Sequence, residues 1–217
     1  RDSLLVLPTG GGKSLCYQVP PVVAGRMDVV ISPLIALMKD QVDGLRQAGY
    51  PTAAVHSQLN DQERQEMRHC VREGRCRLLF VTPERLLTPR FLEFLERRGV
   101  RSFTIDEAHC ISQWGHDFRP EYRRLAELRQ HFPRASLHAC TATATRRVQQ
   151  DILEQLQLVD PEVLVGHFDR PNLVYRVLPA SNTQHQVLEV IRRHAGEAAI
   201  VYCLSRNDTE SMAAHLE

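Results

Sequence analysis

Short apolar runs alternate with longer amphipathic stretches along most of this chain. The apolar runs predict seven strands, at residues 4–7, 27–31, 52–55, 78–81, 100–105, 136–140 and 163–165. The amphipathic stretches predict helices from about residue 15, from Ser32-Pro33 to Gly49, at 62–73 with Asp61 as cap, at about 90–97, from Pro120 and at 146–156. Strands that are apolar along their whole length are buried on both faces. The pattern therefore predicts an α/β fold, a parallel sheet with helices on both faces.

The rhythm breaks at residues 168–172, which predict a linker. Beyond it the pattern predicts a strand at 173–178, a helix at 183–194, a strand at 198–203 and a helix at 208–216. We therefore expect one domain over 1–168 and the beginning of a second α/β unit over 169–217. About 45 residues are too few for a complete doubly wound domain. This, and an end inside a helical pattern, lead us to expect a piece of a longer protein.

Composition narrows the class of protein. A hydrophobic content of 43%, a charged content of 24% and the lack of a long apolar run are typical of an ordinary soluble protein and not of a membrane protein. The net charge of +1 gives no overall basic footprint, so any nucleic acid contact must come from local patches. None of the six cysteines forms a C-x-x-C pair, which argues against a zinc site and favours reduced structural thiols. Cys16, Cys140 and Cys203 are expected to be buried.

The candidate chemistry begins directly after the first strand. There the chain reads Pro8, Thr9, Gly10, Gly11, Gly12, Lys13, Ser14 and then turns into a helix. Glycines let successive N–H groups point at phosphate oxygens, the lysine reaches the β- and γ-phosphates, and the serine hydroxyl binds Mg²⁺. Leu7 stands where the usual G-x-x-x-x-G-K-[ST] pattern has its first glycine. The alternative is a glycine-rich turn without a ligand. We predict a nucleoside triphosphate site.

A second candidate group closes the strand at 100–105, where Asp106 and Glu107 follow directly. In phosphate-loop enzymes an acid at such a strand end holds Mg²⁺, partly through water, and a neighbouring acid activates the attacking water. We therefore predict Lys13, Asp106 and Glu107 as catalytic residues, with Ser14 and Asp106 at the metal. The carboxyl ends of parallel strands share one edge of a sheet, where binding groups gather. The phosphate loop, Ser32, Thr82 and Thr141 all fall at such ends.

Asp106-Glu107-Ala108-His109 resembles the DEAH box of superfamily 2 helicases, and further stretches resemble the RecQ family. They read TGGGKSLCYQ (9–18), SPLIALMKDQ (32–41), TPER (82–85), DEAHCISQWGHDFRPEY (106–122), TATAT (141–145) and FDRPNL (168–173). The resemblance covers nearly the whole chain. It implies a RecA-like lobe of an ATP-dependent DNA helicase that uses Mg²⁺, moves 3′ to 5′ on single-stranded DNA and unwinds duplexes in recombination and repair.

The resemblance also implies roles for individual residues. The stretch from Ser112 to Arg119 corresponds to the family's aromatic-rich loop, which couples single-strand binding to hydrolysis. Bases stack on such exposed rings with about 1–3 kcal/mol each. DNA-binding or coupling roles fall on Ser32, Thr82, Arg85, His109, Gln113, Trp114, His116, Phe118, Arg119, Thr141 and Thr143. The alternatives are that Trp114 and Phe118 pin the loop to the core, and that Thr141 and Thr143 only cap the following helix.

Other functions stay open at this point. A phosphotransferase or GTPase switch would need an acceptor site or a guanine-reading Asn-Lys-x-Asp, which the sequence does not contain. An ATP-binding scaffold and an RNA helicase of the same superfamily are further alternatives. The resemblance places the adenine-reading motif before residue 1, and the arginine fingers and the zinc-binding and winged-helix regions after residue 217. We therefore expect these 217 residues alone to be nearly inactive.

Overall fold

The computed structural model describes residues 1–169 and 171–216. Arg170, which belongs to the FDRPNL stretch, and Glu217 lie outside the described residues. The chain divides into two compact units, with the division after Asp169. Each unit is described by itself.

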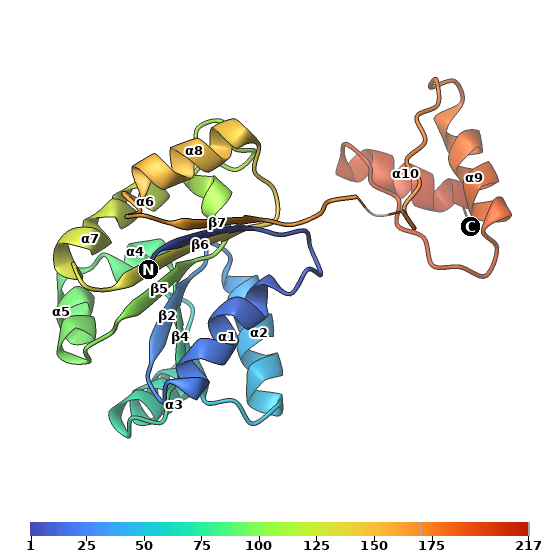
Figure 1. Ribbon diagram of the computed structural model, residues 1–217. Coiled ribbons are helices and arrows are strands. Elements are labelled where there is room, and N and C mark those ends of the chain that lie inside the picture. Colours follow the sequence, from blue (N-terminus) through green and yellow to red (C-terminus); the bar gives the residue numbers. More distant parts are fainter. Residues whose placement is uncertain (170, 217) are drawn as a thin grey trace. The chain divides into compact units, whose positions relative to one another are not determined.

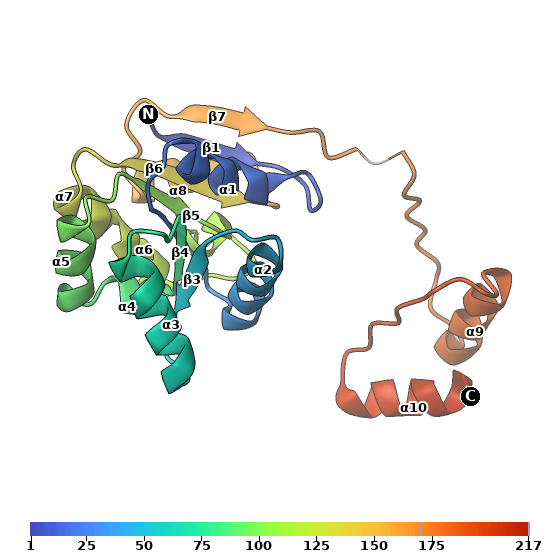
Figure 2. The same cartoon turned by 90° about the horizontal axis from the view of Figure 1, so that it is seen from below.

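The first unit is built on a seven-stranded parallel sheet in the order β3-β4-β2-β5-β6-β1-β7 (Figure 1). All the pairings are parallel, and the seven strands predicted for this unit all form. Their bounds are β1 (Ser3–Val6), β2 (Asp28–Ile31), β3 (Thr52–Val55), β4 (Leu78–Val81), β5 (Ser102–Ile105), β6 (Ser136–Thr141) and β7 (Glu162–Val165). Figure 2 shows β7 beside β1 at one edge and β3 near α2 and α3 at the other.

Helices cover both faces of this sheet, as the apolar strands predict. Their bounds are α1 (Lys13–Val23), α2 (Ile35–Gln47), α3 (Asp61–Arg72), α4 (Pro83–Leu86), α5 (Pro89–Arg97), α6 (Pro120–Arg123), α7 (Leu128–His131) and α8 (Arg146–Gln155), with 3₁₀ turns η1 (Ala108–Ile111) and η2 (Arg124–Glu127). No described helix is both long enough and apolar enough to cross a bilayer.

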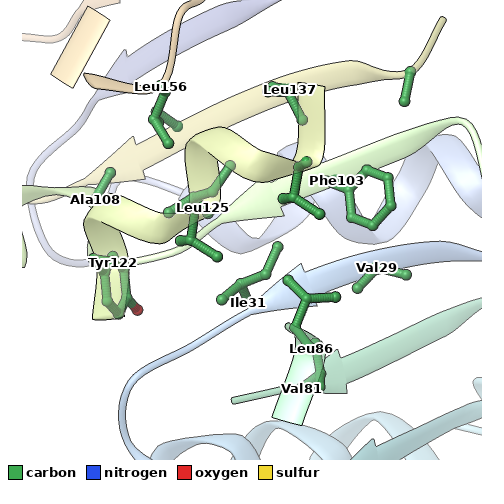
Figure 3. Close-up of a cluster of buried hydrophobic side chains, with 14 of the residues drawn as sticks. Val29, Ile31, Val81, Leu86, Phe103, Ala108, Tyr122, Leu125, Leu137 and Leu156 are labelled. Atoms are coloured by element: carbon green, nitrogen blue, oxygen red, sulfur yellow. The ribbon is translucent and has the colours of Figure 1, made fainter. Parts of the chain in front are cut away.

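Side chains alternate between the two faces along each strand and so build two cores. Val30 and Phe80 point to the smaller core, where α1 and α2 contribute Tyr17, Met38 and Val42. Their neighbours, such as Ile31 and Val81, point to the larger core, to which α3 to α8 all contribute. Figure 3 shows Leu86, Tyr122 and Leu125 packed toward Ile31 and Phe103 in this larger core. Burial on both faces fixes the strand register, because a one-residue slip would exchange the two faces.

The segment after Pro120 differs from the single helix that the pattern predicts. It forms α6, η2 and α7 in succession, yet its predicted buried residues Tyr122, Leu125, Leu128 and Phe132 are all buried. Tyr122, Leu125 and Leu128 are spaced by three. That spacing fits the three residues per turn of a 3₁₀ segment better than a continuous α-helix.

Three smaller predictions are wrong. Asn60, not Asp61, caps α3: its side chain accepts the Glu63 N–H (2.9 Å), and Glu63 accepts the Asn60 N–H (2.8 Å). Cys16 is exposed and Cys203 is only half-buried, whereas Cys140 is buried as expected. After β4 the chain forms the short helix α4, in which Pro83 takes the first helical position, where no N–H is needed.

The second unit contains α9 (Thr183–Arg193) and α10 (Arg206–Leu216). The strands predicted at 173–178 and 198–203 do not form within residues 171–216. Their side chains are open to solvent, with Val177 97% and Tyr202 90% exposed. A strand needs a hydrogen-bonded neighbour and a face to bury. Neither is present in this stretch.

Candidate nucleotide site and the adjoining loop

The loop between β1 and α1 has the backbone that a phosphate cradle requires. Gly10 and Gly12 have φ of 77° and 81°, which side chains rarely tolerate, and a Cβ at Gly11 would lie 2.9 Å from the Pro8 carbonyl oxygen. The Gly11 N–H donates to Pro8 O (2.9 Å) and so closes the turn. Gly12 is the N-cap of α1, so the free N–H groups of the helix start point to the same place as the loop.

The Lys13 ammonium lies over this loop. Its Nζ donates to Leu7 O (2.9 Å) and Pro8 O (3.2 Å), which are the carbonyl groups that open the turn. These neutral acceptors hold a positive charge beside the free N–H groups. The combination suits a multiply charged anion such as a triphosphate.

Ser14 belongs to a partly buried chain of polar groups that sequence reasoning missed. Tyr17 Oη lies 3.1 Å from Ser14 Oγ and donates to Gln41 Oε1 (2.8 Å). Burial, and after it the Asp106 carboxylate, raises the pKa of Tyr17. Gln41 is the last residue of the SPLIALMKDQ stretch and lies on α2. That position was the only available signal.

Asp106 is a buried carboxylate at the end of β5, 5% exposed. Burial, and then repulsion from Glu107, raises its pKa to about 6. The Glu107 N–H, which donates to Asp106 Oδ1 (3.0 Å), Lys13 and Gln41 oppose this rise. Burial destabilises the ionised form of a carboxylate, and a cation beside it stabilises that form again. Asp106 and Ser14 therefore suit a hard divalent ion such as Mg²⁺.

Glu107 has a strained backbone, at φ 49° and ψ 44°, which turns the chain out of the strand. Its side chain is paired to His109, with Glu107 Oε2 3.3 Å from His109 Nδ1. This hydrogen bond is the main reason that the pKa of Glu107 is lowered, and burial opposes it. The two neighbouring acids thus have pKa values shifted in opposite directions, as expected where one carboxylate attracts a metal and the other stays ionised as a base.

A buried polar relay leads from Glu107 into the strand beside it. His109 Nδ1 also lies 3.0 Å from Thr141 Oγ1, and Thr141 Oγ1 donates to Thr143 O (3.2 Å) and accepts the Thr143 N–H (3.2 Å). Thr141 is fully buried at the end of β6. Thr145, and not Thr141 or Thr143, caps α8.

The predicted aromatic-rich loop begins where η1 ends. Gly115 fits there because a Cβ would lie 2.5 Å from the His109 carbonyl oxygen. The His116 ring stacks on His109 with centroids 4.1 Å apart, so the loop and the acidic site are in direct contact. Arg119 pairs with Asp117 (2.9 Å) and donates to the Pro33 carbonyl (3.2 Å), which ties the loop to the segment after β2.

The two large aromatic residues of this loop face arginines. Trp114 is 59% exposed, with the Arg147 guanidinium 3.3 Å from its ring centroid, and Arg123 lies 5.3 Å from the Phe118 ring. Trp114 is therefore not buried in the core, which was the alternative reading of the sequence. Gln113, next to it, is exposed as well.

Thr82 and Arg85 lie toward the other side of the sheet, whereas Ser32 follows β2, whose Ile31 pairs with Ile105 directly before Asp106. Thr82 follows β4, which stands four places from β1 in the strand order, or about 19 Å at the usual strand spacing. Ser32, after β2, is fully buried, and Arg85 packs over the Phe91 ring at 5.6 Å. The structure thus brings Lys13, Ser14, Asp106 and Glu107 together, with Ser32 at the end of the neighbouring strand, and keeps Thr82 and Arg85 apart along the same edge.

The chain is also similar to known proteins along its whole length. Residues 1–152 match the family model of the DEAD/DEAH box helicases. The chain is 43% identical over 216 residues to the ATP-dependent DNA helicase RecQ of Pasteurella multocida, covering all of this chain and 34% of that protein. It is 40% identical over 228 residues to the RecQ-like DNA helicase BLM of Xenopus laevis, covering all of this chain and 17% of that protein.

Solved structures show the same fold at lower identity. The helicase MrfA bound to DNA and AMPPNP has a TM-score of 0.73 at 17% identity, over all of this chain and 33% of that one. The helicase Lhr of Mycobacterium smegmatis, bound to single-stranded DNA and AMP-PNP, has a TM-score of 0.67 at 19% identity, over 99% of this chain and 31% of that one. The chain spans about a third of the length of the first curated relatives that it matches.

Proposed function

Because the chain belongs to the DEAD/DEAH box helicase family, we propose that it forms the ATP-binding part of a DNA helicase of the RecQ type. In this proposal residues 1–168 are the first RecA-like lobe, and residues 169–217 are the linker and the start of the second. The observation that carries it is the pair formed by the buried Asp106 and the half-buried Glu107 at one strand end beside the phosphate loop, with pKa values shifted apart.

The phosphate loop, residues 8–14, binds the triphosphate. Its N–H groups and the Lys13 ammonium donate hydrogen bonds to the phosphate oxygens. To do so, the ammonium leaves the carbonyl oxygens of Leu7 and Pro8 that it contacts in the structure. Ser14 and Asp106 hold Mg²⁺, partly through water, and this ion supplies charge neutralisation at the phosphates when it is bound. The fit rests on Asp106, a carboxylate that is only 5% exposed and whose pKa is raised chiefly by burial. A cation beside it would offset that cost.

Glu107 is the general base of the proposed reaction. Its lowered pKa keeps it ionised at neutral pH, and its bond to His109 orients it. The base accepts a proton from the attacking water at a carboxylate oxygen. The site thus supports hydrolysis, and not only nucleotide binding.

The contacts around His109 support a link between hydrolysis and nucleic acid binding. His109 contacts Glu107, Thr141 and, by stacking, His116 of the aromatic-rich loop. If the loop moves when it binds a nucleic acid strand, it therefore displaces His109, which orients the general base Glu107. We assign coupling to His109, His116, Thr141 and Thr143. We assign contact with the nucleic acid strand to Ser32, Thr82, Arg85, Gln113, Trp114, Phe118 and Arg119.

The full-length protein is proposed to act on DNA. The two RecQ-type relatives described above are named as DNA helicases, and the whole of this chain matches a part of each. We propose single-stranded and duplex DNA as substrates, 3′ to 5′ movement, a role in recombination and repair, and action on chromosomal DNA in the cytoplasm or nucleoid.

The decisive experiment is ATP turnover by the full-length protein with single-stranded DNA, with single-stranded RNA and with neither. We expect strong stimulation by DNA only. Equal stimulation by RNA would identify an RNA helicase, and slow turnover that neither polymer changes would identify an ATP-binding scaffold or switch. Glu107→Gln is the matched control, because it keeps the shape of the side chain and removes the base. Its loss of turnover shows that the measured activity belongs to this site.

A further inference from the structure

A hollow of about 740 Å³ opens at the carboxyl ends of β3 and β4, away from the phosphate loop. Its walls come from the segment after β2, the segment after β3, one face of α3 and the turn of α4. Thr82 and Arg85 lie in one wall, and for these two residues the family resemblance implies contact with DNA. Arg64 and Arg68 of α3 lie in another, and neither the sequence motifs nor the family resemblance gives these two residues a role.

The charge of this hollow is positive. Its lining contains three guanidinium groups, of Arg64, Arg68 and Arg85, and one carboxylate, of Glu84. Arg64 lies 3.6 Å from Asp61, whose side chain is fully exposed, so this ion pair is weak. No carboxylate within residues 1–169 and 171–216 lies within 4.0 Å of the Arg68 guanidinium. Both arginines are thus available to an anion from outside.

Unsatisfied polar groups lie in and behind the same hollow. His56, in its lining, has a buried Nδ1 without a hydrogen-bond partner in the described part of the chain. Ser32, next to the lining residue Pro33, is fully buried, and its Oγ also has no partner there. Buried polar groups are normally hydrogen-bonded, so each such atom needs an explanation. Both atoms are shielded from solvent, so they mark a polar floor behind the hollow and are not themselves the anion contacts.

We propose that Arg64 and Arg68 of α3 contact backbone phosphates of a nucleic acid strand that lies in this hollow. The inference rests on the proposed function, since it extends the strand's path beyond the segments at Thr82 and Arg85. Two arginines one helical turn apart on a helix face provide two adjacent positive charges. Such contacts carry no base specificity and hold the strand by its backbone. They also give this edge of the sheet a local basic patch, although the whole chain has a net charge of only +1.

The test is the salt dependence of binding of the full-length protein to a fluorescein-labelled oligo(dT), followed by fluorescence anisotropy. Each phosphate neutralised on a single strand contributes about 0.7 to the slope of log affinity against log salt concentration. Arg64→Gln and Arg68→Gln should therefore each reduce the slope by about 0.7, and the double variant by about 1.4. Arg72→Gln is the matched control, on the same helix with the same charge removed but outside the hollow. Its slope should equal that of the wild type.

The outcomes separate this inference from the proposed function. If the wild-type protein does not bind oligo(dT), the proposed function fails. If it binds and Arg64→Gln and Arg68→Gln keep the wild-type slope, or if Arg72→Gln lowers the slope as much as they do, this inference is overturned. A second measurement needs no substitution: saturating oligo(dT) should slow the modification of Arg64 and Arg68 by phenylglyoxal and leave Arg72 unaffected. Equal labelling with and without the oligonucleotide would also overturn the inference.

Discussion

Replacing Asp106 with asparagine should make the first unit more stable while abolishing its chemistry. Asp106 is 5% exposed, and its pKa rises from the ordinary 3.8 to about 6, chiefly through burial. The folded protein therefore binds this proton more tightly than the unfolded chain does. Between pH 4 and 6 the contribution of Asp106 to the free energy of unfolding consequently falls as pH rises. Above pH 6 the buried carboxylate is ionised and lowers the free energy of unfolding by a constant amount.

The size of this cost follows from the pKa. One pKa unit is worth about 1.4 kcal/mol, so a rise from 3.8 to about 6 corresponds to about 3 kcal/mol. Asparagine keeps the oxygen that accepts the Glu107 N–H. The new amide N–H groups are buried and lose hydrogen bonds to water that the fold replaces only in part. We therefore expect the free energy of unfolding to rise by about 1–3 kcal/mol at pH 7.5. The gain should fall to about half by pH 5, where the folded wild type is already mostly protonated.

The assay is urea unfolding of the 217-residue chain between pH 5 and 8, followed by the fluorescence of Trp114, the only tryptophan and a residue of the first unit. Glu107→Gln is the control of opposite sign. Its lowered pKa means that its ionised form stabilises the fold above its ordinary pKa, so this variant should be less stable at pH 7.5. If Asp106→Asn has the wild-type unfolding midpoint at pH 7.5, or a lower one, then burial does not penalise this carboxylate and our argument for the cation site fails.

Further predictions follow from the same contacts. Lys13→Ala should reduce ATP turnover by the full-length protein by about 100- to 1000-fold; turnover within a factor of two of wild type would refute the assignment of the loop. Glu107→Gln should still bind nucleotide in a filter assay but not hydrolyse it; loss of binding would make Glu107 structural. Asp2 accepts the N–H groups of Leu137 and Val159 and pairs with Arg129 while buried, so Asp2→Ala should lower the free energy of unfolding by about 3–5 kcal/mol, and an unchanged urea midpoint would contradict this. In the 217-residue chain, single-stranded DNA should change Trp114 fluorescence only slightly and only at low salt; a large change at 200 mM salt would contradict the division of strand contacts between two lobes.

The sequence by itself determined the sheet and located the candidate nucleotide site. Buried parallel strands must be apolar along their length, so seven short runs located all seven strands of the first unit. The phosphate loop and Asp106-Glu107 are local in the sequence, and their function depends on backbone shape at a single strand end. That is why glycines at 10–12 and two acids after a buried strand were sufficient to predict them.

Only the tertiary structure decided what depends on neighbours distant in the sequence. Tyr17 and Gln41 join Ser14 to Asp106 across two helices, and the rise in the Asp106 pKa comes from burial that no pattern quantifies. Arg64 and Arg68 look like an ordinary solvated helix face until β3 and β4 place them around a hollow with Thr82 and Arg85. The strands predicted at 173–178 and 198–203 failed for the same reason. An apolar run becomes a strand only when a neighbour satisfies its backbone hydrogen bonds and covers its side chains.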